Sequence, residues 1–175
     1  MKFIFKLLMF LLVFILSVLI FFPKQSAYNF LEHELFKEKL IISGEKRIEK
    51  AFSLTIKDGD VYLKGINVAN INKASFTSYL VYTKVQIKDI RLLESLKSIF
   101  PTPISSIKLK HSILEFDKVK ISANGVFGNV NGSIDIINRI ITLELYASSE
   151  MRSSYSKILS QMKLKEGRYF YEYRY

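Results

Sequence analysis

The chain has 175 residues, with 26 Lys and Arg against 16 Asp and Glu, so its formal net charge at pH 7 is +10. It contains no cysteine, which excludes a disulfide framework, a thiolate metal site and a lipoprotein cysteine. The residues beyond an apolar first segment amount to about one ordinary domain, which is long enough to bury a single core.

The first segment, residues 3–22, is apolar except for Lys6 and Ser17. A helix needs about 20 such residues to cross the hydrocarbon core of a bilayer. We therefore predict a membrane anchor over residues 1–23, with its cationic start in the cytoplasm and everything after it exported. The side chains expected to span the bilayer include those of Phe3, Leu7, Phe10, Phe14, Leu19 and Phe22.

A cleaved secretory signal would also export the chain, but it needs a small-x-small cleavage site. The nearest candidate is Gln25-Ser26-Ala27, where a bulky polar residue stands in the place of a small one. A pilin-like subunit would carry a glutamate near the start of the apolar helix, and residues 3–22 contain none. The retained anchor is therefore favoured over the signal, and the pilin is set aside.

After the anchor, residues 24–40 predict a short juxtamembrane helix that Ser26 caps. From residue 41 the period of the apolar positions changes to two, and Asp58-Gly59 suits a tight hairpin turn. This alternation continues through most of residues 41–175 and is typical of antiparallel strands with one buried and one solvated face. Residues 41–175 are therefore predicted to form a periplasmic domain built on a curved sheet.

Two helical patterns interrupt the strands. Leu92, Leu96 and Ile99 share one face of a short helix that Pro101 ends. Apolar residues from Met151 to Met162 recur at helical spacing and predict an amphipathic helix. The predicted fold class is thus a single transmembrane helix followed by a mainly β (α+β) domain, a curved antiparallel sheet with a few amphipathic helices.

Residues suited to catalysis or metal binding are sparse. His33 lies on a charged helical face and His111 between strand-like runs, and no carboxylates stand at the spacing of a metal site. The sequence has no G-x-S-x-G elbow and no glycine loop that cradles phosphate. We therefore predict no catalytic, cofactor-binding or metal-ligating residue, and a protein that is not an enzyme.

The excess positive charge lies mainly on the exported part, where lysines recur singly along strands, as at Lys84, Lys88, Lys108 and Lys110. This spacing favours a solvated sheet face. Anionic lipid headgroups and nucleic acid are the partners that a basic domain otherwise suits. Export of the domain argues against nucleic acid.

Five stretches form a pattern typical of one family: Pro23 with the helix of residues 28–40, residues 52–66, the strands of 75–92, residues 103–111 and the glycine-spaced run 125–136. Together they resemble the type II secretion system protein N family in its compact form. AsmA-like and TamB-like periplasmic proteins share this plan of anchor and curved sheet. The resemblance implies a bitopic protein of the bacterial inner membrane whose periplasmic domain assists the secretion machinery. The family pattern is structural, so it assigns no role to a single residue.

Two functions follow from these expectations. The first is an inner-membrane-anchored accessory subunit of a type II secretion system, which contacts other secretion-system proteins along sheet edges or through the amphipathic helix. The second is AsmA/TamB-like lipid binding or transfer in an apolar groove of the sheet. The residues expected to contact the partner or the lipid are Leu54, Ile56, Val85, Ile87, Leu143 and Leu145.

Overall fold

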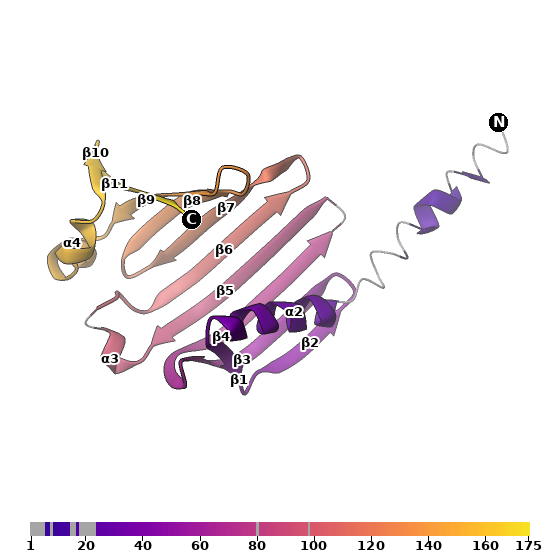
Figure 1. Ribbon diagram of the computed structural model, residues 1–175, viewed down its shortest axis with the longest axis horizontal. Helices are drawn as coiled ribbons and strands as arrows, with labels where there is room; N and C mark the ends of the chain where they lie inside the picture. The colour runs from indigo at the N-terminus through magenta and orange to yellow at the C-terminus, as the bar shows by residue number, and fades with distance from the viewer. Residues whose placement is uncertain (1–5, 8, 15–16, 18–23, 80, 98) are drawn as a thin grey trace.

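The computed structural model describes residues 6–7, 9–14, 17, 24–79, 81–97 and 99–175. These residues are mostly strand and form an 11-stranded antiparallel sheet with a few short helices (Figure 1). The first half contains α2 (Lys24–Lys37), β1 (Leu40–Ser43), β2 (Lys46–Lys50), β3 (Ser53–Leu63), β4 (Ile66–Tyr79), β5 (Tyr82–Leu92) and α3 (Glu94–Lys97). The second half contains β6 (Ile104–Ser112), β7 (Glu115–Gly125), β8 (Gly128–Asp135), β9 (Ile140–Ala147), α4 (Ser149–Ser154), α5 (Ser156–Leu159), β10 (Lys163–Lys165) and β11 (Arg168–Arg174).

The predicted fold class was wrong, because the described residues contain no transmembrane helix of the kind with which it begins. No helix of the described residues is long and apolar enough to cross a membrane. The longest of them, α2, has 14 residues, or about 21 Å at 1.5 Å per residue, against a hydrocarbon core of about 30 Å. Of the residues expected to span the bilayer, Leu7, Phe10 and Phe14 are helical and exposed. The other three, Phe3, Leu19 and Phe22, lie outside the described residues.

The strands lie across the sheet nearly in chain order, from β1 to β9, followed by β11 and then β10. Both β1 and β2 pair with β3, so these two short strands share one edge of the sheet and β10 forms the other. Lys64 and Gly65, between β3 and β4, have φ of 52° and 82°, the left-handed values that a two-residue hairpin turn needs. Figure 1 shows α2 beside β1–β4 and α4 at the opposite end of the sheet.

On each of four neighbouring strands, one residue has no partner in the pairing register, and these four residues lie in a line across the sheet. The pairing register omits Asp58 in β3, Asn72 in β4, Asp89 in β5 and Ser105 in β6. Asp58 and Asp89 have φ of 56° and 53°. Aligned irregularities of this kind bend a sheet, and we call this line the crease. It also switches which residues of β3 are buried, from Leu54 and Ile56 before the crease to Gly59 and Val61 after it.

The crease explains a second wrong prediction. Asp58-Gly59 has the composition of a hairpin turn, but both residues lie inside the continuous strand β3. The left-handed conformation that the pair favours occurs at Asp58 within the strand instead of in a turn. The strand therefore continues to Leu63, and the turn forms at Lys64 and Gly65.

The core lies on one side of the sheet in two clusters. The larger cluster joins residues beyond the crease, such as Ile71, Ile90 and Ile104, to Met151 of α4 and Leu159 of α5. The smaller cluster consists of Tyr28 from α2 with Leu54 and Ile56 from β3. Helix α2 at one end of the sheet, and the short helices α4 and α5 at the other, thus cover the same face.

The predicted amphipathic helix of residues 151–162 is divided. Helix α4 begins after Ser148, whose side-chain oxygen accepts a hydrogen bond from the backbone N–H of Met151, a typical N-cap. Tyr155 has φ of −125° and ψ of 33°, which ends α4 and separates it from α5. The Tyr155 hydroxyl donates a hydrogen bond to the backbone oxygen of Lys97 at 2.8 Å. This contact holds the α4–α5 segment against the segment that follows β5.

Candidate functional site: an apolar trough on the sheet

All six of the predicted contact residues lie on one face of the sheet, which we call the inner face. In an antiparallel pair, residues directly opposite each other point to the same side. The register brings Leu54, Val85 and Leu143 into one transverse row, and Ile56, Ile87 and Leu145 into the next. We call the first the trough row, which comprises Leu54, Phe76, Val85, Leu109, Ile121, Gly132, Leu143 and Tyr171. The second is the core row, which comprises Ile56, Ala74, Ile87, Ile107, Ala123, Val130, Leu145 and Tyr169.

The two rows differ in what covers them. Leu145 of the core row is buried in the larger cluster, and most other members of that row pack against it. In the trough row, Leu54 is only 1% exposed because it belongs to the cluster with Tyr28. The middle of the row is different: the residues Phe76, Val85, Leu109, Ile121 and Leu143 are half-buried, and neither core cluster of the described residues includes them.

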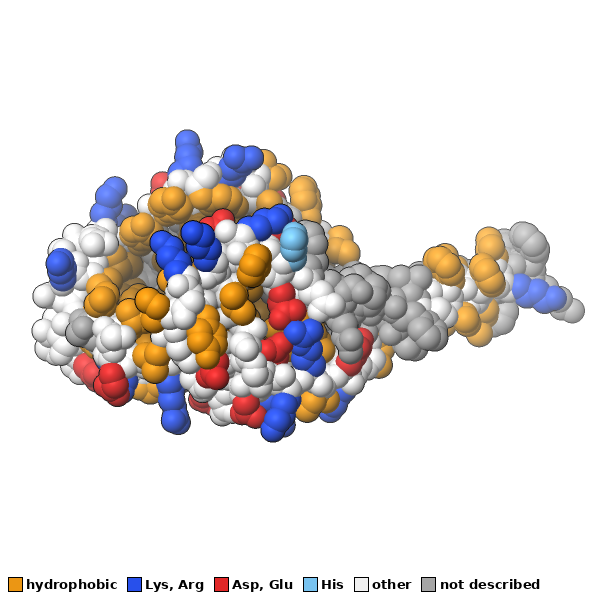
Figure 2. Space-filling view, turned by 60° about the horizontal axis from the view of Figure 1, so that its bottom comes forward, with side chains coloured by type: hydrophobic (Ala, Val, Ile, Leu, Met, Phe, Trp, Pro, Cys, Tyr) orange, Lys and Arg blue, Asp and Glu red, His pale blue; other side chains and the backbone are white. Residues whose placement is uncertain are grey.

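These five side chains therefore line a trough between the helix-covered ends of the inner face. Figure 2 shows hydrophobic side chains gathered around a hollow in the molecule. From β4 to β9 the row crosses five strand spacings, or about 24 Å at about 4.8 Å each. The next row away from the crease extends the apolar surface with half-buried Val119, Ile134 and Ile141.

One wall of the trough is fixed by Arg47 of β2. Its Nη2 lies 2.9 Å from Glu32 Oε1, and its Nη1 donates to Asn29 Oδ1 at 3.0 Å, so it ties β2 to α2. The Arg47 guanidinium also lies 4.6 Å from the centre of the Tyr28 ring, a cation–π contact. Burial, together with the nearby Glu32 carboxylate, raises the pKa of Tyr28 to about 12. The Tyr28 hydroxyl is thus neutral at physiological pH, and Tyr28 packs in the apolar contact between α2 and β3.

Gly132 allows β8 to approach β9 closely where the trough row crosses these two strands. A Cβ atom at this position would lie 2.3 Å from the backbone oxygen of Thr142 and 2.7 Å from Leu143 Cδ2. Such distances are well inside van der Waals contact, so a side chain would force β8 away from β9. Glycine is therefore required where the trough row passes between Ile121 and Leu143.

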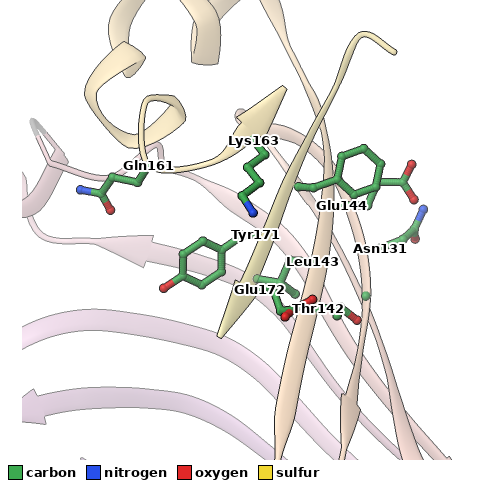
Figure 3. A pocket seen from close by; sticks show the side chains of 10 residues that line it. Asn131, Thr142, Leu143, Glu144, Gln161, Lys163, Tyr171 and Glu172 are labelled. Carbon is green, nitrogen blue, oxygen red and sulfur yellow. The ribbon is translucent and has the colours of Figure 1, made fainter. Parts of the chain in front are cut away.

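A cavity of about 510 Å³ lies where the trough row reaches β9 and β11. Leu143 and Tyr171 of the trough row line it, together with polar groups such as Lys163 and Glu172. Figure 3 shows Gln161, Lys163 and Tyr171 on one side of β11, and Glu144 and Asn131 on the other. The volume lies within the range of small-molecule sites. The Arg168 guanidinium, which donates to Glu144 Oε1 at 2.6 Å, lowers the pKa of that carboxyl.

Polar groups stand at the end of the inner face that lies away from the crease. Ser78 and Thr83 are opposite each other, and their hydroxyl oxygens are 3.3 Å apart. His111, opposite Thr83, has its Nε2 atom 3.1 Å from the backbone oxygen of Phe116. Within the described part of the chain, no three His, Cys, Asp or Glu side chains form a group that could hold a metal ion. These groups can form hydrogen bonds to a polar ligand head, and the apolar trough begins next to them.

Three of the five central trough residues, Phe76, Leu109 and Ile121, are not among the contact residues predicted from the sequence. Leu109 and Ile121 belong to period-two runs, and Phe76 lies in the strand region of residues 75–92, so the alternation contained the needed signal. What it lacked was the register, which decides that these residues stand beside Val85 and Leu143. No family model, curated protein or solved structure matches the chain, so the family resemblance stays a prediction.

Proposed function

We propose that the chain binds an apolar ligand in the trough, and that this ligand is the acyl chain of a lipid. One observation carries the proposal: five apolar side chains on five strands stand in a row, half-buried, outside both core clusters of the described residues. A folded chain gains free energy by covering such a surface. A bound hydrocarbon chain would cover it without displacing α2 or α4.

The dimensions of the trough suit an acyl chain. The hydrocarbon core of a bilayer is about 30 Å thick, so one acyl chain reaches about 15 Å. The trough row spans about 24 Å between β4 and β9, which accommodates one extended chain. Each methylene group removed from water contributes about 0.8 kcal/mol, so contact with even half of a chain gives useful affinity. The hydroxyls of Ser78 and Thr83 at the open end would face the polar head.

The edges of the sheet favour this function over pairing with a partner strand. Strand β2 contains Lys46, Arg47 and Lys50, and β10 contains Lys163 and Lys165. Short edge strands with lysines discourage the addition of another strand. A role as an accessory subunit of a secretion system, in the periplasm and at the inner membrane, stays a prediction. Its expected contact along the edges has less physical support than the trough.

A lipid-binding assay with matched variants tests the proposal. Protein purified without detergent is titrated with a fluorescent fatty acid, and bound lipid is identified by native mass spectrometry. The test variant, Val85→Thr with Ile121→Thr, keeps β-branched side chains and replaces a methyl group of Val85 and the ethyl group of Ile121 with hydroxyls. The control, Ser122→Thr, changes the neighbouring residue of β7, which points to the opposite face.

We expect the wild type and Ser122→Thr to bind the fatty acid equally. The double variant should bind at least about tenfold more weakly, since about 1.4 kcal/mol of lost apolar contact corresponds to that factor. Equal binding by the double variant and the control would contradict a ligand in the trough. Wild-type protein that binds no fatty acid and carries no lipid would contradict the proposed function itself.

A further inference from the structure

The face of the sheet opposite the trough, the outer face, carries an unusual concentration of lysines over β2–β7. The register places them at positions that alternate with the apolar residues of the inner face. Together they form what we call the lysine face: Lys46, Lys50, Lys57, Lys73, Lys84, Lys88, Lys108, Lys110 and Lys120. Figure 2 shows Lys and Arg side chains projecting from the outer edges of the molecule.

Two sets of these lysines stand directly opposite one another on neighbouring strands. The first ladder runs from Lys46 through Lys57 and Lys73 to Lys88, across β2, β3, β4 and β5. The second ladder consists of Lys84, Lys110 and Lys120, across β5, β6 and β7. Adjacent strands are about 4.8 Å apart, and like charges directly opposite each other destabilise a sheet. A folded chain that keeps such ladders gains from any anion that neutralises them.

The sheet itself supplies little neutralising charge. The positions between the ladders hold hydroxyl and amide side chains, such as Thr55, Ser75, Gln86 and Ser122, together with Ile48 and Lys108. Among the ion pairs of the described residues, one involves this face, between Lys120 Nζ and Glu115 Oε2 at 2.7 Å. Most of the positive charge on the lysine face is therefore available to an external anion.

We propose that the lysine face docks on an anionic lipid surface. The two ladders lie four residues apart along β5, or about 13 Å, and the face extends about 24 Å from β2 to β7. A two-dimensional array of flexible point charges matches a plane of headgroups, to which lysines near an anionic bilayer are attracted. Docking through the lysine face does not require a ligand in the trough, because the two surfaces are on opposite faces of the sheet.

The composition of the face favours lipid over nucleic acid. The basic residues of the two ladders are all lysine, whereas bidentate recognition of phosphates or bases favours arginine. Single-stranded nucleic acid also needs aromatic side chains on which bases stack, and the ladder rows and the row between them contain none on β2–β7. An anionic bilayer needs neither feature.

Sedimentation with vesicles tests this proposal. Full-length protein is mixed with vesicles of phosphatidylcholine alone, or of equal parts phosphatidylcholine and phosphatidylglycerol, at low and at high salt. The test variant is Lys73→Gln/Lys88→Gln/Lys110→Gln. The control, Lys39→Gln/Lys64→Gln/Lys157→Gln, removes the same number of charges from two turns and from α5. The difference between the two vesicle types isolates the electrostatic part of binding from any apolar insertion.

We expect the wild type to prefer the anionic vesicles and to lose that preference at high salt, because salt screens exposed charges. The preference of the test variant for anionic over neutral vesicles should be about 100-fold smaller than that of the wild type, because each lysine contributes about fivefold. The control should lose much less of this preference. Equal losses in both variants would show that net charge, not this face, governs binding, and would overturn the proposal. It would also be overturned by equal binding to both vesicle types, or by DNA that displaces the protein from anionic vesicles. A folded far-ultraviolet circular dichroism spectrum is required of each variant.

Discussion

The two faces of this sheet are made by the same strands and have opposite character. On β5, Val85 and Ile87 point to the inner face, while Lys84 and Lys88 point to the outer face. The inner face is packed beyond the crease and beneath α2, and it is left half-buried between them. The outer face repeats like charges across neighbouring strands, where mixed charges would be more stable. Each face thus departs from what stability alone would favour, and we interpret each departure as a binding surface.

The largest loss of stability is expected where the trough row is covered, and a smaller loss where it is open. Leu54→Ala should lower the free energy of unfolding by about 2–5 kcal/mol, since Leu54 is 1% exposed and packs against Tyr28. Leu109→Ala, the same substitution in the same row, should cost clearly less because Leu109 is half-buried outside both clusters. Denaturant unfolding of both variants measures the difference. Equal losses would mean that the centre of the trough row is as well packed as the core.

A smaller loss of stability is expected from adding a side chain at Gly132 of β8. Gly132→Ala should destabilise the fold by about 1–3 kcal/mol, because the new methyl group would meet the backbone oxygen of Thr142. Ser133→Ala, at the neighbouring position of the same strand, is the control. Thermal unfolding of the two variants would show the contrast. A Gly132→Ala protein as stable as the control would contradict the close approach of β8 and β9.

The stability that the contact between α2 and β3 contributes should fall at alkaline pH. The pKa of Tyr28 is about 12 in the folded chain and about 10 when the chain unfolds, so the folded state favours the protonated hydroxyl. This contribution is complete below pH 10 and is lost as the pH rises from 10 towards 12. Tyr28→Phe should therefore lose less stability than the wild type over this range. Parallel losses in the two proteins would show that Tyr28 ionises as easily in the folded chain as in the unfolded one.

The smallest expected effect is a gain in stability on the outer face. Lys73→Gln should stabilise the sheet by about 0.2–1 kcal/mol at low salt, because Lys73 stands between Lys57 and Lys88. High salt should reduce the gain by screening the remaining repulsion. Denaturant unfolding at two salt concentrations measures it. Destabilisation at both concentrations would mean that Lys73 has a favourable contact that outweighs the repulsion.

The sequence predicts which way side chains point more reliably than where strands end. Period-two alternation correctly groups Leu54 with Ile56 and Val85 with Ile87, because a strand directs every second side chain to the same side. It cannot foresee the crease, where Asp58 in left-handed conformation changes the buried positions without ending β3. It also cannot reveal the lysine ladders, since Lys57 and Lys73 become neighbours only through the register. The single helix expected from Met151 to Met162 divides at Tyr155, whose hydroxyl bonds to a distant backbone oxygen.

For the apolar first segment, the sequence pattern led to a wrong prediction. A run of apolar residues of sufficient length predicted a transmembrane helix. The described residues contain no helix that is long and apolar enough to cross a membrane, and only Leu7, Phe10 and Phe14 of the expected spanning set are among them.

Photolabelling with a fatty acid that carries a diazirine near the middle of its chain would show directly which residues contact a bound acyl chain. After irradiation of the full-length protein, mass spectrometry of peptides locates the labelled residues. We expect labels on the trough-row residues Val85, Leu109 and Ile121, and we expect these labels to disappear when unlabelled fatty acid competes. Labels that lie on the outer face, or that persist under competition, would contradict an acyl-chain site in the trough.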